Sequence, residues 1–216
     1  LTSLMRDMYV DIPGKKSNRI NTAYFSGGAS LAIRTINTNF DMNVEDYISV
    51  DFYALEDIID LVGGVDIDVS KSEVKYINQY IDETNKIEGK FGREKKKVNH
   101  VSKSGLQTLN GRQAVAYCRN RYSGRDDFER TERQRRVMNL LMQKGMDISV
   151  TKIPELVNTV LPSVETSLTK TEIVGLATTI LGFGKQDIEQ FRIPTDDGFQ
   201  DKNVDGMLVL VPDLEL

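Results

Sequence analysis

One short stretch of the chain concentrates side chains that could bind an anion. Residues 116–137, with the sequence AYCRNRYSGRDDFERTERQRRV, hold seven arginines interleaved with acidic residues. Helical spacing puts Asp127, Arg130 and Gln134 on one face of a predicted helix, at positions i, i+3 and i+7. These residues lie near the N-terminus of that helix, where the helix dipole favours an anion. Asp127 is expected to begin or cap the helix.

Two further arginines, Arg119 and Arg121, end the preceding element. Residues two apart in an extended chain point the same way, so both could face one ligand, and the loop YSGRDD folds them back toward Arg130. Guanidinium groups that converge from several directions suit a polyanion with tetrahedral oxygens, and a pyrophosphate is the natural candidate. The alternative is a network of surface ion pairs on an exposed helix.

A second candidate site follows the first predicted strand, at Arg6 and Asp7. In α/β folds, ligands bind outside the carboxyl ends of strands. An aspartate at that point can hold a divalent cation, and hard oxygen ligands suit Mg²⁺, which often bridges to phosphate. A structural salt bridge between the two residues fits the pattern equally well.

Other catalytic chemistry is scarce in this sequence. His100 is the only histidine and lies in a polar segment, which argues against a histidine-based triad or a zinc cluster. Cys118 is the only cysteine, and we expect it to pack in the core. The formal net charge of −4 argues against a general nucleic-acid binder, because such proteins are usually basic.

Hydrophobic periodicity predicts strands alternating with helices, and therefore an α/β or mixed three-layer domain. Residues 11–28 and the polar, lysine-containing residues 85–103 are expected to be loops. The strands are expected at 1–5, 47–52, 65–69, 189–194 and 207–212, and the helices at 29–40, 54–62, 72–84, 111–118, 128–146, 153–160 and 170–181.

The chain of 216 residues is long enough for one domain with a sizeable core, and we expect residues 1–216 to form a single domain. It opens on LTSLM, which reads as the middle of a strand. We therefore expect upstream strands, and a membrane anchor, outside this sequence. Within it, no apolar run is long enough to span a bilayer.

Six ordered blocks resemble the LytR-CpsA-Psr family over residues 1 to about 145, with a family-like tail to 212. The blocks are LTSLMRDMYVDIPG, NRINTAYFSGG, AIRTIN, VDFYALEDIIDLVGGVDIDV, LNGRQAVAYCRNR and DDFERTERQRRV.

The resemblance implies a mixed central β-sheet flanked by helices in three α-β-α layers, with a hydrophobic lipid pocket for a polyprenyl chain. It also implies a Mg²⁺-dependent phosphotransferase, held by a single-pass N-terminal anchor on the extracytoplasmic face of the membrane of a Gram-positive-type bacterium. Such enzymes attach glycopolymers, such as wall teichoic acid or capsule polysaccharide, from polyprenyl-pyrophosphate carriers to peptidoglycan.

Site residues carry over motif by motif. Asp7 would bind Mg²⁺, and the resemblance implies a further acidic metal ligand upstream of this chain. Asp127 would orient or deprotonate the attacking hydroxyl, or only hold Arg130. The residues implied to contact phosphate are Arg6, Arg34, Arg119, Arg121, Arg130 and Gln134.

Three activities remain open on this site: transfer to a sugar hydroxyl, hydrolysis of the pyrophosphate by water, or non-catalytic binding of a lipid-linked polymer in a regulatory role. The plain alternative is an acidic α/β domain with a surface ion-pair helix. We expect an elongated apolar cavity opening beside Arg119 and Arg121, and both to share one site with Arg6, Asp7 and Arg130. Arg130 is expected to lie on an exposed helix face, so that its loss costs little stability.

Overall fold

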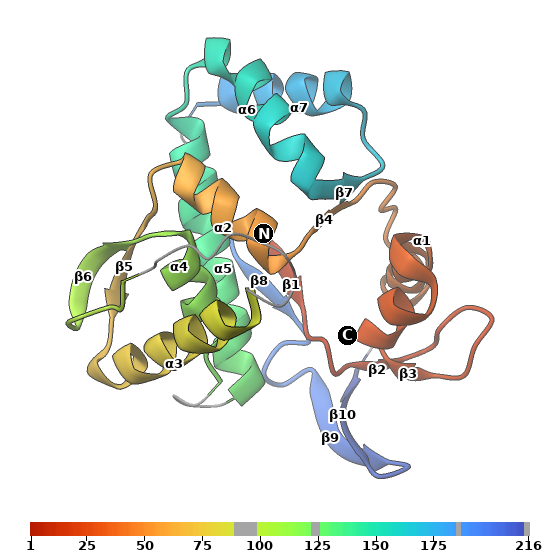
Figure 1. The fold of residues 1–216 in the computed structure, drawn as a ribbon. Helices are drawn as coiled ribbons and strands as arrows, with labels where there is room; N and C mark the ends of the chain where they lie inside the picture. The colour runs from red at the N-terminus through yellow and green to blue at the C-terminus, as the bar shows by residue number, and fades with distance from the viewer. Residues whose placement is uncertain (89–98, 122–125, 185–186, 214–216) are drawn as a thin grey trace. The chain divides into compact units, whose positions relative to one another are not determined.

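The computed structural model describes residues 1–88, 99–121, 126–184 and 187–213 (Figure 1). The chain folds into two compact units, each with most of its contacts within itself. Unit 1 comprises residues 1–49, 166–168 and 189–216, and unit 2 comprises residues 50–165 and 169–188.

Unit 1 is built from short paired strands and one helix. Strand β1 (Thr2–Leu4) runs parallel to β8 (Phe191–Ile193), and the other pairs in this unit are antiparallel. A backbone hydrogen bond from Leu210 N to Asp7 O, 3.0 Å long, ties β10 to the turn after β1. The remaining elements are β2 (Tyr9–Val10), β3 (Asn18–Arg19), α1 (Asn21–Phe40), β9 (Phe199–Val204) and β10 (Met207–Pro212).

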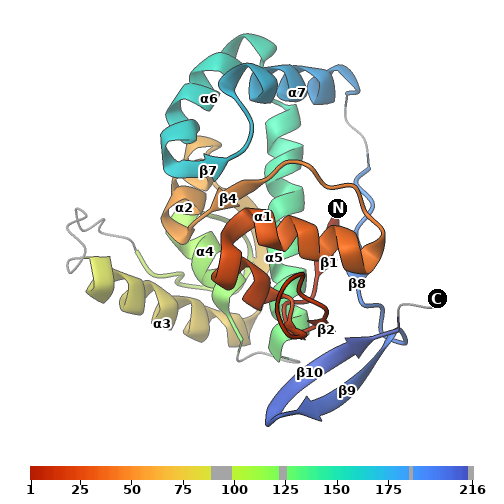
Figure 2. The same ribbon diagram turned by 90° about the vertical axis from the view of Figure 1, so that its right-hand side faces the viewer.

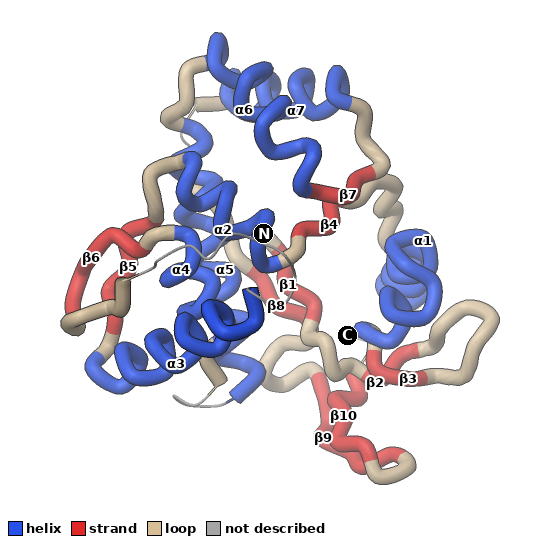
Figure 3. The backbone as a smooth tube through the Cα atoms, viewed as in Figure 1, coloured by secondary structure: helices blue, strands red, loops and turns tan. Residues whose placement is uncertain are grey.

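Unit 2 is mainly helical, as the blue tube in Figure 3 shows. Helices α6 and α7 lie side by side in two views at right angles (Figures 1 and 2). Its elements are α2 (Phe52–Leu61), β5 (Val65–Val69), α3 (Lys71–Glu88), β6 (Gly105–Leu109), α4 (Gly111–Arg119), α5 (Asp126–Met146), α6 (Ile153–Val160) and α7 (Lys170–Gly182), with short 3₁₀ turns at Val150–Lys152 and Leu161–Ser163. Two further short strands, β4 (Ile48–Val50) and β7 (Val164–Thr166), lie where the chain passes from one unit to the other in sequence.

Sequence periodicity explains these elements locally. In β5, Val65, Ile67 and Val69 are buried and the intervening aspartates are exposed, as period two requires. Asn110 begins α4 with a capping box, in which its side chain accepts from Gln113 N and the Gln113 side chain accepts from Asn110 N. The core of unit 2 gathers side chains of β5, β6 and the helices, including Ile59, Ile77, Ile81, Leu109, Tyr117, Cys118 and Val137.

The mixed α/β class is confirmed, with both parallel and antiparallel pairs among the described strands. Every helix predicted from periodicity is present, but several short strands were missed. Residues 11–28 are not one loop, because β3 lies within them and α1 already begins at Asn21. The loop expected over residues 85–103 begins later than predicted, because α3 continues to Glu88, and residues 89–98 lie outside the described residues. A single domain over residues 1–216 stays a prediction.

Helices α2 and α4 approach each other at Gly111. A Cβ atom placed on Gly111 would lie 2.1 Å from the Glu56 carbonyl oxygen, far inside contact distance. Two hydrogen bonds join the helices at this contact. Gly111 N donates to Asp60 Oδ1 at 2.6 Å, and the buried Arg112 Nε donates to Glu56 Oε1 at 2.6 Å. Only glycine lets the two backbones meet at this distance.

We therefore expect Gly111→Ala to reduce the free energy of unfolding by about 3 kcal/mol or more, because the backbones must separate and the buried ion pair must stretch. Gly145→Ala is the matched control: it is also helical, and its added Cβ meets nothing within 4 Å. That change should be neutral or stabilising by up to about 1 kcal/mol. Urea unfolding measures both, and equal effects would contradict the close-approach account.

Candidate functional site

As predicted, Asp7 lies in the turn just past the end of β1. Its carboxylate lies between two arginine side chains. Arg6 Nε is 3.3 Å from Asp7 Oδ2, and Arg19 Nε is 3.3 Å from Asp7 Oδ1. The Asp7 side chain is only 15% exposed. The two cations therefore balance a carboxylate that is largely withdrawn from water.

Arg19 was not singled out from the sequence. It reaches Asp7 because β2 and β3 pair antiparallel with Tyr9 opposite Arg19, which folds the chain back on itself. Arg19 Nη2 donates to the Leu208 carbonyl oxygen at 2.6 Å, while its Nε faces the carboxylate of Asp7 as an ion-pair partner. The polar segment around Gly14, which separates Tyr9–Val10 from Asn18–Arg19, is the sequence feature that could have predicted this hairpin.

The donor set around Asp7 limits what metal it can hold. Across the described ranges, no group of three or more His, Cys, Asp or Glu side chains is arranged to bind a metal ion. A single carboxylate fits Mg²⁺ that takes most of its oxygen ligands from phosphate and water, and does not fit a cage made by protein alone.

Arg34 lies in α1 and its side chain is exposed. It follows an interruption of the helix at Gly27 and Gly28, where the backbone leaves helical geometry and Gly28 adopts φ +64°. The predicted contact of Arg34 with phosphate stays a prediction.

Arg119 ends α4 and is held by side chains of α2 and α3. Its guanidinium carbon lies 4.9 Å from the ring centre of Phe52 and 4.9 Å from that of Tyr80. Its Nη1 donates to Thr84 Oγ1 at 3.3 Å. Cation–π contacts of this length hold the group without a carboxylate.

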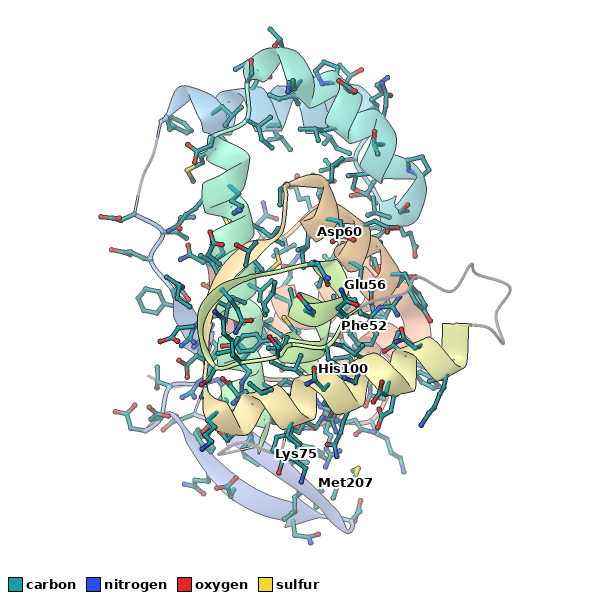
Figure 4. All side chains as sticks on the ribbon, turned by 60° about the vertical axis from the view of Figure 1, so that its left-hand side comes forward. Phe52, Glu56, Asp60, Lys75, His100 and Met207 are labelled. Carbon is teal, nitrogen blue, oxygen red and sulfur yellow. The ribbon has the colours of Figure 1, made fainter. Side chains whose placement is uncertain are left out.

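One face of α2 supplies this packing. Phe52, Glu56 and Asp60 follow one another at steps of four residues along the helix (Figure 4). All three contact α4, since Asp60 binds Gly111, Glu56 binds Arg112, and Phe52 stacks on Arg119. The two helices are therefore linked at both ends of α4.

The first turns of α5 carry Asp127 and Arg130, which pair with each other. Arg130 Nη2 lies 2.8 Å from Asp127 Oδ1, and the Arg130 residue is only 7% exposed. The prediction that Arg130 lies on an exposed face is therefore wrong, and with it goes the reason for expecting that its loss costs little stability. The i, i+3 spacing indicated that Asp127 is the partner of Arg130. It could not show that other parts of the fold cover the helix at this position.

Arg133 joins the two halves of the arginine-rich stretch, and the sequence reasoning missed it. Its Nε donates to Glu73 Oε1 at 2.9 Å, its Nη1 to the Asn120 carbonyl oxygen at 3.1 Å, and its Nη2 to Glu129 Oε2 at 2.8 Å. Only the Glu129 contact, one helical turn away, was visible as a sequence pattern. Arg133 thus fixes the end of α4 against the start of α5.

The interior of unit 2 shifts the pKa values of Glu73 and Cys118 in opposite directions. Burial works to raise the pKa of Glu73, but hydrogen bonds from the Ser70 backbone and from Arg133 outweigh it and hold the pKa below its ordinary value of 4.5. Burial raises the pKa of the Cys118 thiol to about 12, so it stays protonated, as expected of a core cysteine.

Arg121 and Gln134 are both exposed. The structure thus places Arg119, Arg121, Asp127, Arg130 and Gln134 in unit 2 at the facing ends of α4 and α5, and Arg6, Asp7 and Arg34 in unit 1. Convergence of all of them on one ligand stays a prediction. So does the apolar cavity beside Arg119: the two cavities described in unit 2, each about 540 Å³, lie at the other end of α5, around Lys144 and Asp147.

Comparison with known proteins decides the family. The sequence model of the LytR_cpsA_psr family matches residues 1–215. The chain belongs to this family.

Individual relatives of this LytR_cpsA_psr chain carry two kinds of name. The regulatory protein MsrR of Staphylococcus aureus is 32% identical over 94% of this chain and 57% of its own length. The polyisoprenyl-teichoic acid–peptidoglycan teichoic acid transferase TagU of Enterococcus faecalis is 30% identical over 95% of this chain and 62% of its own. This chain therefore spans only about half to three fifths of the curated relatives it matches.

Solved structures show the same fold. TagV of B. subtilis matches with a TM-score of 0.74 and 27% identity, covering 99% of this chain and 78% of that one. TagT with bound octaprenyl pyrophosphate lipid matches with a TM-score of 0.70 and 23% identity, covering 99% and 73%, and at that identity the likeness shows the fold alone. Within the described residues, no helix has both the length and the hydropathy for crossing a membrane.

Because Arg130 is buried, we expect Arg130→Ala to lower the free energy of unfolding by about 2–3 kcal/mol, since the change leaves Asp127 without its cation. Gln134→Ala, one turn later and exposed, should change it by no more than about 0.5 kcal/mol. Chemical denaturation of both variants measures the difference. If the Arg130→Ala protein were as stable as Gln134→Ala, the buried Arg130–Asp127 pair would not contribute to stability, which would contradict this account.

Glu73 predicts a pH dependence of stability. A carboxyl group whose pKa is lowered by folding stabilises the fold above its unfolded pKa, and this contribution is lost as pH falls through the folded pKa. Glu73→Gln should therefore cost about 3 kcal/mol at pH 7, and its deficit relative to wild type should shrink as the pH is lowered below 4.5.

The control for this change is Glu132→Gln, because Glu132 is 57% exposed and pairs with Arg136 at 3.4 Å on the same helix as Arg133. Its effect should stay below about 1 kcal/mol at every pH. Urea midpoints from pH 7 to pH 3 test both variants. A Glu73→Gln deficit that is constant over this range would contradict the assigned charge pairing.

Proposed function

We propose that this protein is a Mg²⁺-dependent phosphotransferase that moves a glycopolymer from a polyprenyl-pyrophosphate carrier to peptidoglycan. The observation that carries the proposal is the state of Arg119: its charge is held by aromatic rings and a hydroxyl, and so remains available to an anion. Family membership and relatives that are named teichoic acid transferases support it. TagT, which shares the fold, holds octaprenyl pyrophosphate.

The proposed reaction is a displacement at phosphorus. A sugar hydroxyl of peptidoglycan forms a new bond to the phosphorus that carries the polymer and gives up its proton. The bridging P–O bond breaks, and polyprenyl phosphate leaves with the bridging oxygen and takes up a proton. Pyrophosphate resists this attack because its negative oxygens repel the nucleophile, and arginines lower that barrier by stabilising the charge on the leaving phosphate.

The residues take separate roles in this proposal. Arg119 and Arg121 bind phosphate oxygens from the end of α4, and Arg6 and Arg34 contribute from unit 1. Asp127 orients Arg130, to which it is bonded at 2.8 Å, and exposed Gln134 extends the same face.

Asp7 would hold Mg²⁺, with Arg6 and Arg19 ion-paired to the same carboxylate. Mg²⁺ would supply charge neutralisation at the phosphate oxygens and stabilise the leaving group. We propose that the reaction takes place at the extracytoplasmic face of a Gram-positive-type membrane, with wall teichoic acid as the first polymer to try, and the names of the relatives support this proposal.

We expect Asp7→Asn to reduce transfer by about 100-fold or more and to raise the Mg²⁺ concentration that half-saturates it, in line with losing one group that stabilises the transition state. Lipid binding should persist, because apolar contacts hold the isoprenoid. Asp201→Asn is the matched control, the same change at an exposed position of β9 in the same unit.

The assay combines the protein with polyprenyl-pyrophosphate-linked teichoic acid, peptidoglycan and Mg²⁺, and identifies products by mass spectrometry. A glycan-linked phosphodiester with polyprenyl phosphate supports transfer. Released, unlinked polymer would instead assign a pyrophosphate hydrolase. Tight lipid binding with no turnover would assign the non-catalytic, regulatory role that the name of MsrR suggests for that relative.

A further inference from the structure

The surroundings of Arg119 differ from those of the buried arginines nearby. Arg112, Arg130 and Arg133 each pair with a carboxylate, at 2.6, 2.8 and 2.9 Å. Among the residues that the structure describes, Arg119 instead has the rings of Phe52 and Tyr80 at 4.9 Å each and the hydroxyl of Thr84 at 3.3 Å. The three contacts come from α2 and α3, while Arg119 itself ends α4.

This difference has a chemical consequence. A carboxylate takes up the in-plane N–H groups of a guanidinium and cancels its charge. An aromatic ring covers the flat face, accepts none of the in-plane N–H groups and carries no net charge. A guanidinium held by rings is therefore fixed in orientation, yet keeps its charge and most of its donors for an anion.

Thr84 adds a directional element. Its Oγ1 donates to the Tyr80 carbonyl oxygen at 2.8 Å, one helical turn back, so a lone pair of the same oxygen is aimed at Arg119 Nη1. The hydroxyl cannot rotate away without losing its own bond. One in-plane donor of Arg119 is thereby fixed, which sets the direction of the others.

We infer that Phe52 and Tyr80 are positioning residues that hold the Arg119 guanidinium in the orientation that binds a pyrophosphate, an inference that rests on the proposed function. Neither ring needs to touch the ligand. Phe52 is 53% exposed and stands at the first residue of α2, so its packing contributes little to the core. Its place is set by the α2–α4 contact at Glu56 and Gly111.

The test measures binding of octaprenyl pyrophosphate in detergent micelles by isothermal titration. Phe52→Leu, which keeps an apolar side chain but removes the ring, should weaken binding by roughly three- to tenfold, as expected for one cation–π contact. Phe52→Tyr keeps the ring and should bind within about twofold of wild type. In an Arg119→Ala background, Phe52→Leu should have no further effect, because a positioning residue acts only through the group it positions.

A second measurement needs no ligand. The Nε–H resonance of Arg119, assigned by its loss in Arg119→Ala, should be displaced by the currents of the two rings. The displacement should be reduced in Phe52→Leu and in Tyr80→Leu, and kept in Phe52→Tyr and Tyr80→Phe. Thermal unfolding of each variant checks that the fold is retained, and the Phe52 series stands alone if Tyr80→Leu does not fold.

The outcomes separate this inference from the function it rests on. If wild-type protein shows the displaced resonance but does not bind octaprenyl pyrophosphate, the proposed function fails and this inference fails with it. If wild type binds but Phe52→Leu binds equally well, or weakens binding as much in the Arg119→Ala background, the rings only tie helices together. The proposed function would then stand without the positioning role.

Discussion

The close approach of α2 and α4 at Gly111 is the constraint on which the arginine site depends. With no side chain at Gly111, the backbone of α4 reaches the Glu56 carbonyl, and the buried Glu56–Arg112 pair closes over the contact. That pair is stabilising only while both partners stay together and out of water. Because Phe52 lies one turn before Glu56 on the same face, the same contact brings its ring to Arg119. The position of Arg119 is thus a consequence of backbone packing two turns away.

The arginines of this chain divide by partner. Two of those paired with carboxylates link helices: Arg112 joins α4 to α2, and Arg133 joins α5 to α3 and to the end of α4. Arg119, held by rings, keeps its charge. An acidic protein can therefore present a strongly basic site, because the acids interleaved in the arginine-rich stretch neutralise only the arginines they contact.

Much of the fold was predictable from local pattern, and the site only in part. Period two located β5, helical periodicity located α2 to α7, and the i, i+3 spacing correctly indicated the Asp127–Arg130 pair. Contacts between residues far apart in sequence carry no such signal. Arg133 finds Glu73 sixty positions earlier, Arg19 reaches Asp7 only after a hairpin forms, and the burial of Arg130 depends on what other elements cover it. These contacts come from tertiary packing, which periodicity does not encode.

The central claim, that ring-held Arg119 binds the pyrophosphate of a polyprenyl carrier, is tested most directly by a crystal structure of the protein with octaprenyl pyrophosphate and Mg²⁺. Phosphate oxygens should lie within hydrogen-bond distance of the in-plane nitrogens of Arg119, with Phe52 and Tyr80 still packed against its guanidinium. A pyrophosphate bound away from Arg119, or a guanidinium that leaves both rings to reach it, would contradict the account.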